Sequence, residues 1–211
     1  MVPIMEELAK LFGGMARVKV MRLFLFNPDT GFDIDDIVER SKIISSVARK
    51  ELSLLESISF ITKKDMQKVV EKKRGGKVHA RRVTVTGYFL NKSFAYIDSL
   101  RLLLLDSGAL YKDELPTRFK NGGKIRLLIT SGVFLGRADE GRLDLFIVGD
   151  YLKRGVIENT IKTIESEIGK ELRYAIFDTK EYDYRLGMYD KLVRDVIDFP
   201  HERLVEKIKV G

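Results

Sequence analysis

Two short apolar runs, separated by a charged, glycine-containing connection, constrain the second half of this chain. They cover residues 125–129 (Ile-Arg-Leu-Leu-Ile) and 143–148 (Leu-Asp-Leu-Phe-Ile-Val). Both are short, rich in β-branched or aromatic residues and bordered by glycine, which predicts two buried strands joined by a loop and a short helix. Asp144 lies early in the second run, where an isolated carboxylate is costly to bury. A carboxylate at a strand start beside a small-residue turn favours a metal or phosphate site.

The rest of this half alternates between apolar periodicities typical of helices and of strands. We expect a third strand over residues 172–177 and a short terminal segment over residues 201–209. Helices are expected over residues 112–119, 153–169 and 180–186 (with Thr179 as the cap), and either a helix or a strand–helix pair over residues 189–199. Such alternation predicts a small α/β domain over residues 107–211.

The stretch from residue 124 to 150 resembles the minimal nucleotidyltransferase domain of the DNA polymerase beta superfamily. In that family a strand leads to a Gly-Ser turn that holds the nucleotide triphosphate, and Asp-x-Asp opens the next strand. These two aspartates and a third from a later strand hold two magnesium ions. Here the turn is reversed as Ser131-Gly132, Arg142 replaces the first aspartate, and only Asp144 remains. The later strand, residues 172–177, contains no aspartate.

These departures predict a nucleotidyltransferase fold with a disabled active site and no catalytic residues, because two-metal phosphoryl transfer needs carboxylates that bridge both ions. If nucleotide binding is retained, the resemblance assigns it to Ser131, Gly132, Arg142 and Asp144, with Asp144 as the remaining metal ligand. No cofactor is expected otherwise; Mg²⁺ and a nucleotide would accompany retained binding. Two alternatives stay open: a purely structural Asp144, and an Arg142 that contacts a nucleotide phosphate.

The positive charge is concentrated in the first half of the chain. The formal net charge is +7, of which residues 1–100 carry +6, from 18 Lys/Arg against 12 Asp/Glu. Nine of these basic residues lie between Lys63 and Arg82, where Asp65 and Glu71 are the only acidic residues. Such asymmetry favours a polyanionic partner for the first half.

Apolar periodicity predicts four helices near the N-terminus, over residues 5–12, 15–26, 34–40 and 45–58. Asp33 is the expected cap of the third helix and Ser45 or Ser46 that of the fourth. Phe32 is expected in a brief strand. An ambiguous segment over residues 61–70 and a strand over residues 77–85 flank Gly75-Gly76 and predict a hairpin. Helices joined by a tight turn, then a hairpin, follow the helix-turn-helix plan.

Residues 10–90 resemble the winged-helix domains of bacterial and archaeal regulators, which carry a Ser-x-x-Val-Arg-Arg-Glu-Leu-x-x-Leu-Glu pattern. The matching residues are 45–56, Ser-Ser-Val-Ala-Arg-Lys-Glu-Leu-Ser-Leu-Leu-Glu. Lys42 and Ser59 replace two glycines, and Lys can adopt the left-handed conformation at modest cost. The resemblance implies DNA contacts from the fourth helix and from the tip of the wing, made by Ser45, Ser46, Ala48, Arg49, Lys50, Lys72, Lys73, Arg74 and Lys77.

The expected fold class is therefore α+β, with a winged helix-turn-helix over residues 1–92, a helix over residues 93–106 and the nucleotidyltransferase-like domain over residues 107–211. The helix over residues 93–106 is expected either to link or dimerise the protein or to pack within its own chain. The sequence has no cysteine, signal-peptide pattern or apolar run of membrane length, so we expect a cytoplasmic protein with no membrane partner.

Three functions fit this organisation. The first is a transcriptional regulator that binds double-stranded DNA, as a monomer or a homodimer, and carries an inactive nucleotidyltransferase fold for dimerisation or ligand sensing. The second is an active metal-dependent nucleotidyltransferase of the toxin–antitoxin type, which modifies a protein or nucleic-acid partner. The third is a protein-interaction module in which the winged helix binds protein.

Overall fold

The computed structural model describes residues 4–74, 77–105, 112–136 and 143–210. Helices and strands both contribute, so the fold class is α+β as expected. The chain forms two compact units, Met1–Arg101 and Leu102–Gly211. Their boundary falls inside helix α5 (Ile97–Leu105), within the segment expected to connect the domains. None of the helices in the described ranges is long and apolar enough to cross a membrane.

Four helices begin the first unit, at positions close to those expected: α1 (Ile4–Phe12), α2 (Met15–Phe26), α3 (Ile34–Ser41) and α4 (Ser45–Ser57). Helix α2 lies at the centre of this unit. It carries buried residues on all of its sides, among them Val18, Phe24 and Leu25. Phe24 contacts Phe32 edge to face, with ring centroids 5.7 Å apart. The core is thus built around an apolar helix rather than a sheet.

The ends of α3 and α4 test the predicted helix caps. Asp33 caps α3 through a reciprocal capping box with Asp36, as expected. Lys42 ends α3 in the left-handed conformation, with φ 48°. The expected serine cap of α4 is wrong: the N-cap is Ile44, which makes no side-chain cap, because Ser45 already lies inside the helix.

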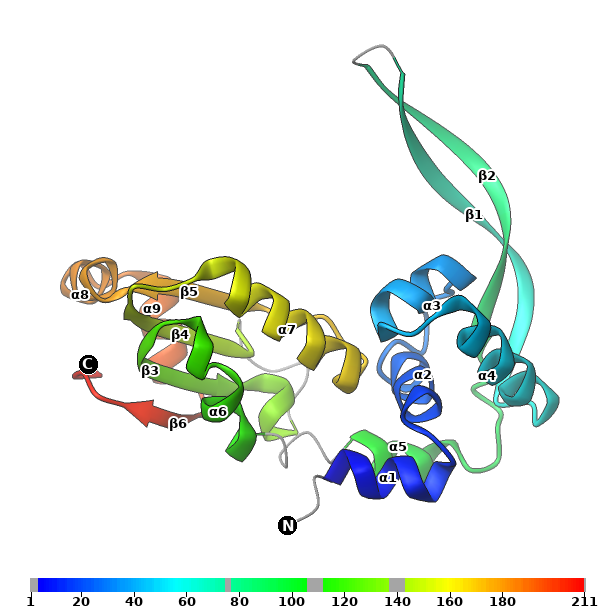
Figure 1. Cartoon of the computed structure of the whole chain (residues 1–211), viewed down its shortest axis with the longest axis horizontal. Coiled ribbons are helices and arrows are strands. Elements are labelled where there is room, and N and C mark those ends of the chain that lie inside the picture. Colours follow the sequence, from blue (N-terminus) through cyan, green and yellow to red (C-terminus); the bar gives the residue numbers. More distant parts are fainter. Residues whose placement is uncertain (1–3, 75–76, 106–111, 137–142, 211) are drawn as a thin grey trace. The chain divides into compact units, whose positions relative to one another are not determined.

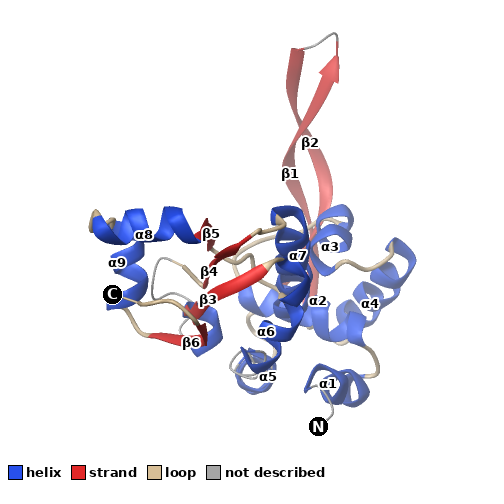
Figure 2. Cartoon of the chain, turned by 60° about the vertical axis from the view of Figure 1, so that its left-hand side comes forward, coloured by secondary structure: helices blue, strands red, loops and turns tan. Residues whose placement is uncertain are grey.

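A long hairpin follows α4. Strands β1 (Ile61–Arg74) and β2 (Lys77–Leu90) have 14 residues each and pair antiparallel without interruption, from Ile61↔Leu90 to Arg74↔Lys77. Its base is held by buried Ile61 and Leu90 and by a bridge in which Phe32 and Tyr88 exchange backbone hydrogen bonds of 3.0 and 2.8 Å. The expected brief strand at Phe32 is this single bridge. The hairpin rises well beyond the helices of its unit (Figures 1 and 2).

Helix α5 begins at Ile97, four residues later than the expected start at Ser93. The intervening residues form turns, in which the Phe94 N–H donates to the Asn91 carbonyl and the Ile97 N–H donates to the Phe94 carbonyl. The side chain of Asn91 also accepts from the Ser93 N–H at 3.1 Å. These bonds satisfy the N–H groups of Ser93, Phe94 and Ile97 without a helix at residues 93–96.

The second unit contains a four-stranded mixed sheet in the order β5-β4-β3-β6. The strands are β3 (Lys124–Ser131), β4 (Leu145–Asp150), β5 (Tyr174–Asp178) and β6 (His201–Glu206). Strand β3 pairs antiparallel with β4 and β6, while β4 and β5 are parallel and joined by α7 (Arg154–Ile168). Strand β6 lies in the segment that was expected to be a short terminal segment rather than a strand.

Helices cover this sheet. On one face Ile129, Phe146 and Val148 pack against Tyr182 of α8 (Thr179–Gly187) and Val193 of α9 (Lys191–Asp198). Alternation turns Leu128 and Ile147 to the opposite face. Shorter helices, η2 (Lys112–Glu114), α6 (Leu115–Arg118), η3 (Lys120–Gly122) and η4 (Gly132–Leu135), complete the unit. The expected Thr179 cap is wrong: Asp178 caps α8 by accepting from the Glu181 N–H at 2.8 Å.

Candidate nucleic-acid interface and the Asp144 site

The first two turns of α4 present a polar, basic surface. Ser45, Ser46, Arg49 and Lys50 are all exposed, as is Ser53 one turn further on. Ala48 is fully buried, so the expectation that it faces DNA is wrong. Helical spacing places it in line with Leu52 and Leu55, on the stripe that faces the core.

Glu51 is the only carboxylate in these two turns, and it points inward. Nε of Arg17, on α2, donates to Oε2 of Glu51 at 2.7 Å, while Nη1 donates to the Phe12 carbonyl at 2.7 Å. Within the described ranges, Arg49 and Lys50 make no side-chain hydrogen bond or ion pair. The exposed face of α4 therefore keeps two unneutralised cations. This role of Glu51 was not predicted, although the spacing of Glu51 from Ala48 and Leu55 places it on the buried stripe.

The N-terminus of α4 adds donors to the same surface. Because Ile44 provides no side-chain cap, the first N–H groups of the helix are left to solvent or to a bound group. A helix N-terminus of this kind favours phosphate. Ile44 itself is 68% exposed beside it and offers an apolar contact.

The hairpin is braced to α3 by one lysine. Nζ of Lys68 donates to Oδ2 of Asp33 at 2.6 Å and to Oδ1 of Asp36 at 2.8 Å. Burial opposes charge on Asp33, but the Lys68 and Asp36 hydrogen bonds outweigh it and hold the pKa of Asp33 below its usual value. Burial likewise opposes charge on Lys68, yet the two carboxylates raise the pKa of Lys68. Lys68 is therefore a structural cation, one of the nine in the basic segment.

The expected wing-tip residues belong to the outer part of the hairpin. Lys72, Lys73 and Arg74 are in β1 and Lys77 opens β2, opposite Arg74. Their side chains lie outside the described part of the structure, as do Gly75 and Gly76 entirely. Nearer the base, Arg81 and Arg82 are described and exposed.

The second candidate site brings Ser131, Gly132 and Asp144 together at the ends of β3 and β4. Asp144 is fully buried, and each of its oxygens accepts hydrogen bonds. Oδ1 accepts from the Val133 N–H at 3.1 Å, and Oδ2 accepts from the Arg173 N–H at 3.0 Å and from Nε of Arg173 at 3.2 Å. Ser131 Oγ donates to the Leu143 carbonyl.

These contacts indicate a structural role for Asp144. Its carboxylate links the turn after β3 to the residue before β5, and Arg173 compensates its charge. A metal ion would have to displace these donors. In the described ranges no group of three or more His, Asp or Glu side chains could hold a metal. Arg142, the fourth expected member of this site, lies outside the described residues.

No protein-family model, curated protein or solved structure matches this chain. The two family resemblances therefore rest on the sequence patterns of residues 45–56 and 124–150. What the geometry adds is the exposed basic face of α4, the braced hairpin and the engaged carboxylate of Asp144.

Proposed function

We propose that the first unit is a winged-helix domain and that the protein binds double-stranded DNA as a transcriptional regulator. One observation carries the proposal: the exposed face of the first two turns of α4 has two unpaired cations, small hydroxyl side chains and no carboxylate. Arg49 matches the acceptors of guanine in the major groove, and the small Ser45 and Ser46 permit close approach to the backbone.

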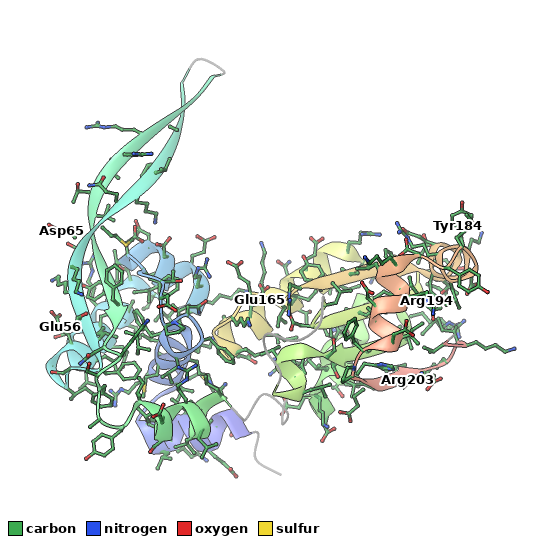
Figure 3. All side chains as sticks on the ribbon, turned by 180° about the vertical axis from the view of Figure 1, so that it is seen from behind. Glu56, Asp65, Glu165, Tyr184, Arg194 and Arg203 are labelled. Carbon is green, nitrogen blue, oxygen red and sulfur yellow. The ribbon has the colours of Figure 1, made fainter. Side chains whose placement is uncertain are left out.

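The polarity of α4 supports the same proposal. Recognition helices contact bases chiefly with their N-terminal residues. Here the basic face occupies the N-terminal half, whereas the exposed carboxylate of Glu56 lies in the C-terminal half (Figure 3). The turn between α3 and α4, Lys42 to Ile44, has the length typical of a helix-turn-helix.

For the second unit we propose a nucleotidyltransferase-like fold that no longer transfers nucleotides and serves dimerisation or ligand sensing. The burial of Asp144 and its pairing with Arg173 support this assignment, because a carboxylate with both oxygens engaged is poorly suited to bridge two ions. A cytoplasmic location belongs to the same proposal.

Fluorescence anisotropy with random-sequence duplex DNA over a salt series tests DNA binding. The informative variant is Arg49→Gln, and Arg101→Gln on α5 is its matched control, since Arg101 is exposed and also loses one charge. We expect Arg49→Gln to weaken binding and to lower the salt slope by at most about one, and Arg101→Gln to leave both unchanged. Absence of binding by the wild-type chain at low salt would overturn the proposal and favour a protein partner. Equal effects of the two variants would exclude α4 as the contact.

A further inference from the structure

An apolar groove opens on the first unit beside the C-terminal half of α4. It lies between the end of α1, α2, α4 and residues 94–100, all within the unit Met1–Arg101. Its volume is about 520 Å³, which falls within the range of about 300–1,000 Å³ typical of pockets for small organic molecules. The groove belongs neither to the basic face of α4 nor to the Asp144 site, so neither of the proposed functions uses it.

Large apolar side chains that line the groove remain in contact with water. Leu11 at the end of α1 is 69% exposed, Tyr96 is 66% exposed and Ile58 at the end of α4 is 50% exposed. The aromatic part of the lining is fixed, because the ring of Phe94 contacts those of Phe60 and Tyr96 edge to face, with centroids 5.6 and 5.8 Å apart. Apolar surface gathered in a hollow of this size favours a bound apolar group.

The charge of the groove has one sign. Among the described residues that line it, the charged side chains are two cations, Lys10 and Arg17, and none is a carboxylate. Arg17 uses two of its nitrogens, since Nε donates to Glu51 and Nη1 donates to the Phe12 carbonyl, each at 2.7 Å. Within the described ranges, Nη2 of Arg17 and Nζ of Lys10 make no hydrogen bond. The groove therefore offers free N–H donors and one unneutralised cation beside an apolar surface.

Gly13 gives the Arg17 guanidinium its position at the groove. Its φ of 80° lies in the left-handed region, which favours glycine. A Cβ at this residue would come within 3.1 Å of Nη1 of Arg17. The break between α1 and α2 thus lets the guanidinium approach the backbone, where the Phe12 carbonyl holds it. A cation fixed before the ligand arrives lowers the entropic cost of binding.

We propose that this groove binds an amphipathic carboxylate, a small molecule with an alkyl or aryl body and one carboxylate group. The body packs against Leu11, Ile58 and Tyr96, and the carboxylate accepts hydrogen bonds from Arg17 and Lys10. A guanidinium in a fixed orientation suits a planar carboxylate, and such charged bonds are stronger than bonds to a neutral acceptor. The inference goes beyond the proposed function, because it requires neither DNA nor a nucleotide.

Isothermal titration calorimetry of the full chain tests the ligand chemistry, with decanoate as the probe. Decanamide and decylammonium have the same alkyl body with a neutral and a cationic head. We expect one decanoate per chain, bound about fivefold more tightly than decanamide, and decylammonium bound more weakly than either. Equal affinity for decanoate and decanamide would overturn the carboxylate contact, and absence of decanoate binding would overturn the site.

Two variants with matched controls locate the ligand. Lys10→Gln should weaken decanoate binding by about three- to fivefold, whereas Lys64→Gln, at an exposed lysine of β1, should not change it. Ile58→Asp should weaken binding by about tenfold or more, because it replaces apolar lining with a like charge. Val69→Asp makes a similar change at an exposed position of β1 and should have no effect. All four residues are exposed, so folding should be retained. Equal losses in a variant and its control would overturn the assigned site.

Sedimentation equilibrium identifies the competing occupant, a second copy of the chain. A dimer that binds no decanoate and that Ile58→Asp dissociates would show that the groove is an interface, which overturns the proposal. A chain whose association state Ile58→Asp leaves unchanged, and whose decanoate binding this substitution removes, is the expected result. Because these titrations contain no DNA, their failure is distinct from a failure of the proposed DNA binding.

Discussion

Arg17 and Glu51 form an ion pair between α2 and α4, with Nε of Arg17 2.7 Å from Oε2 of Glu51. The pair fixes the rotation of α4 about its axis, because Glu51 lies on the buried stripe while Arg49 and Lys50 lie on the exposed face. Because Glu51 is buried and paired with Arg17, it helps to hold α4 against α2. It also leaves the exposed face of the first two turns of α4 without a carboxylate.

Glu51→Gln should destabilise the first unit by about 1–2 kcal/mol, because Arg17 loses its charged acceptor in a partly buried site. Urea unfolding followed by circular dichroism measures this change. Glu56→Gln, the same substitution at an exposed position of the same helix, should alter stability by less than about 0.5 kcal/mol. Similar values for the two variants would mean that the Arg17 pair contributes no stability.

Lys68→Met should loosen the hairpin from α3 and lower stability by about 1 kcal/mol, since it leaves Asp33 and Asp36 without their shared cation. Lys64→Met is a suitable control, as Lys64 is exposed near the base of the same strand. Hydrogen exchange of the β1 and β2 amides would detect the loosening. Unchanged exchange in Lys68→Met would show that the brace is dispensable.

The contact of Lys68 with Asp33 and Asp36 also predicts that the free energy of unfolding depends on pH. The pKa of Asp33 is lowered on folding, so its stabilising contribution is present above the ordinary value of about 3.9 and is lost as the pH falls through the lowered pKa. The pKa of Lys68 is raised, so its contribution is present below about pH 10.4 and is lost above that. Unfolding free energies measured between pH 5 and pH 3 should therefore fall less steeply in Asp33→Asn than in the wild type. Parallel curves would contradict the lowered pKa.

Asp144→Asn should destabilise the second unit by about 1–3 kcal/mol, because an amide nitrogen then replaces one of two buried oxygens that accept hydrogen bonds from the Val133 N–H and from Arg173. Asp183→Asn, an exposed replacement on α8, should be nearly neutral. Thermal unfolding with and without Mg²⁺ and ATP measures both effects. We expect no stabilisation by Mg²⁺ and ATP; a stabilisation that Asp144→Asn abolishes would instead indicate a working nucleotide site.

Two glycines of the second unit should respond oppositely to alanine. At Gly149 an added Cβ would meet the Lys124 carbonyl oxygen at 2.4 Å, so Gly149→Ala should cost about 2 kcal/mol or more. At Gly155, near the start of α7, an added Cβ meets nothing within 4 Å, and alanine should stabilise by about 0.5–1 kcal/mol. Urea midpoints of the two variants should move in opposite directions. A shift in the same direction would show that the β3–β4 contact at Gly149 can relax.

The features that sequence predicted well are local ones. The start of α3 follows from Asp33 and Asp36, whose side chains and backbone N–H groups lie three residues apart. The left-handed conformation of Lys42 was expected from the winged-helix resemblance, in which Lys42 replaces a turn glycine. Both features depend on neighbours along the chain, so a local sequence pattern was sufficient to predict them.

The features that sequence missed depend on distant partners. Strand β6 carries charged residues and was not identified, because its strand character comes from pairing with β3, as in Leu128↔Val205. The engagement of Asp144 was left open, since its donors, Val133 and Arg173, lie 11 and 29 residues away. Ala48 was misplaced because its small side chain was treated as part of a DNA-facing surface, although its helical position belongs to the core.

The pairing of β3 with β6 also sets an order of folding events. Hairpin β1–β2 and the helices before it join residues close in sequence, and such contacts form in microseconds. Strand β3, one of the two inner strands of the second sheet, pairs with β6 only when residues far apart in sequence meet, since Leu127 pairs with Glu206. Closing so long a loop is slow. Refolding followed by temperature jump and by stopped flow should therefore show a fast phase and a slower one, and a Val205→Pro substitution in β6 should affect the slower phase alone.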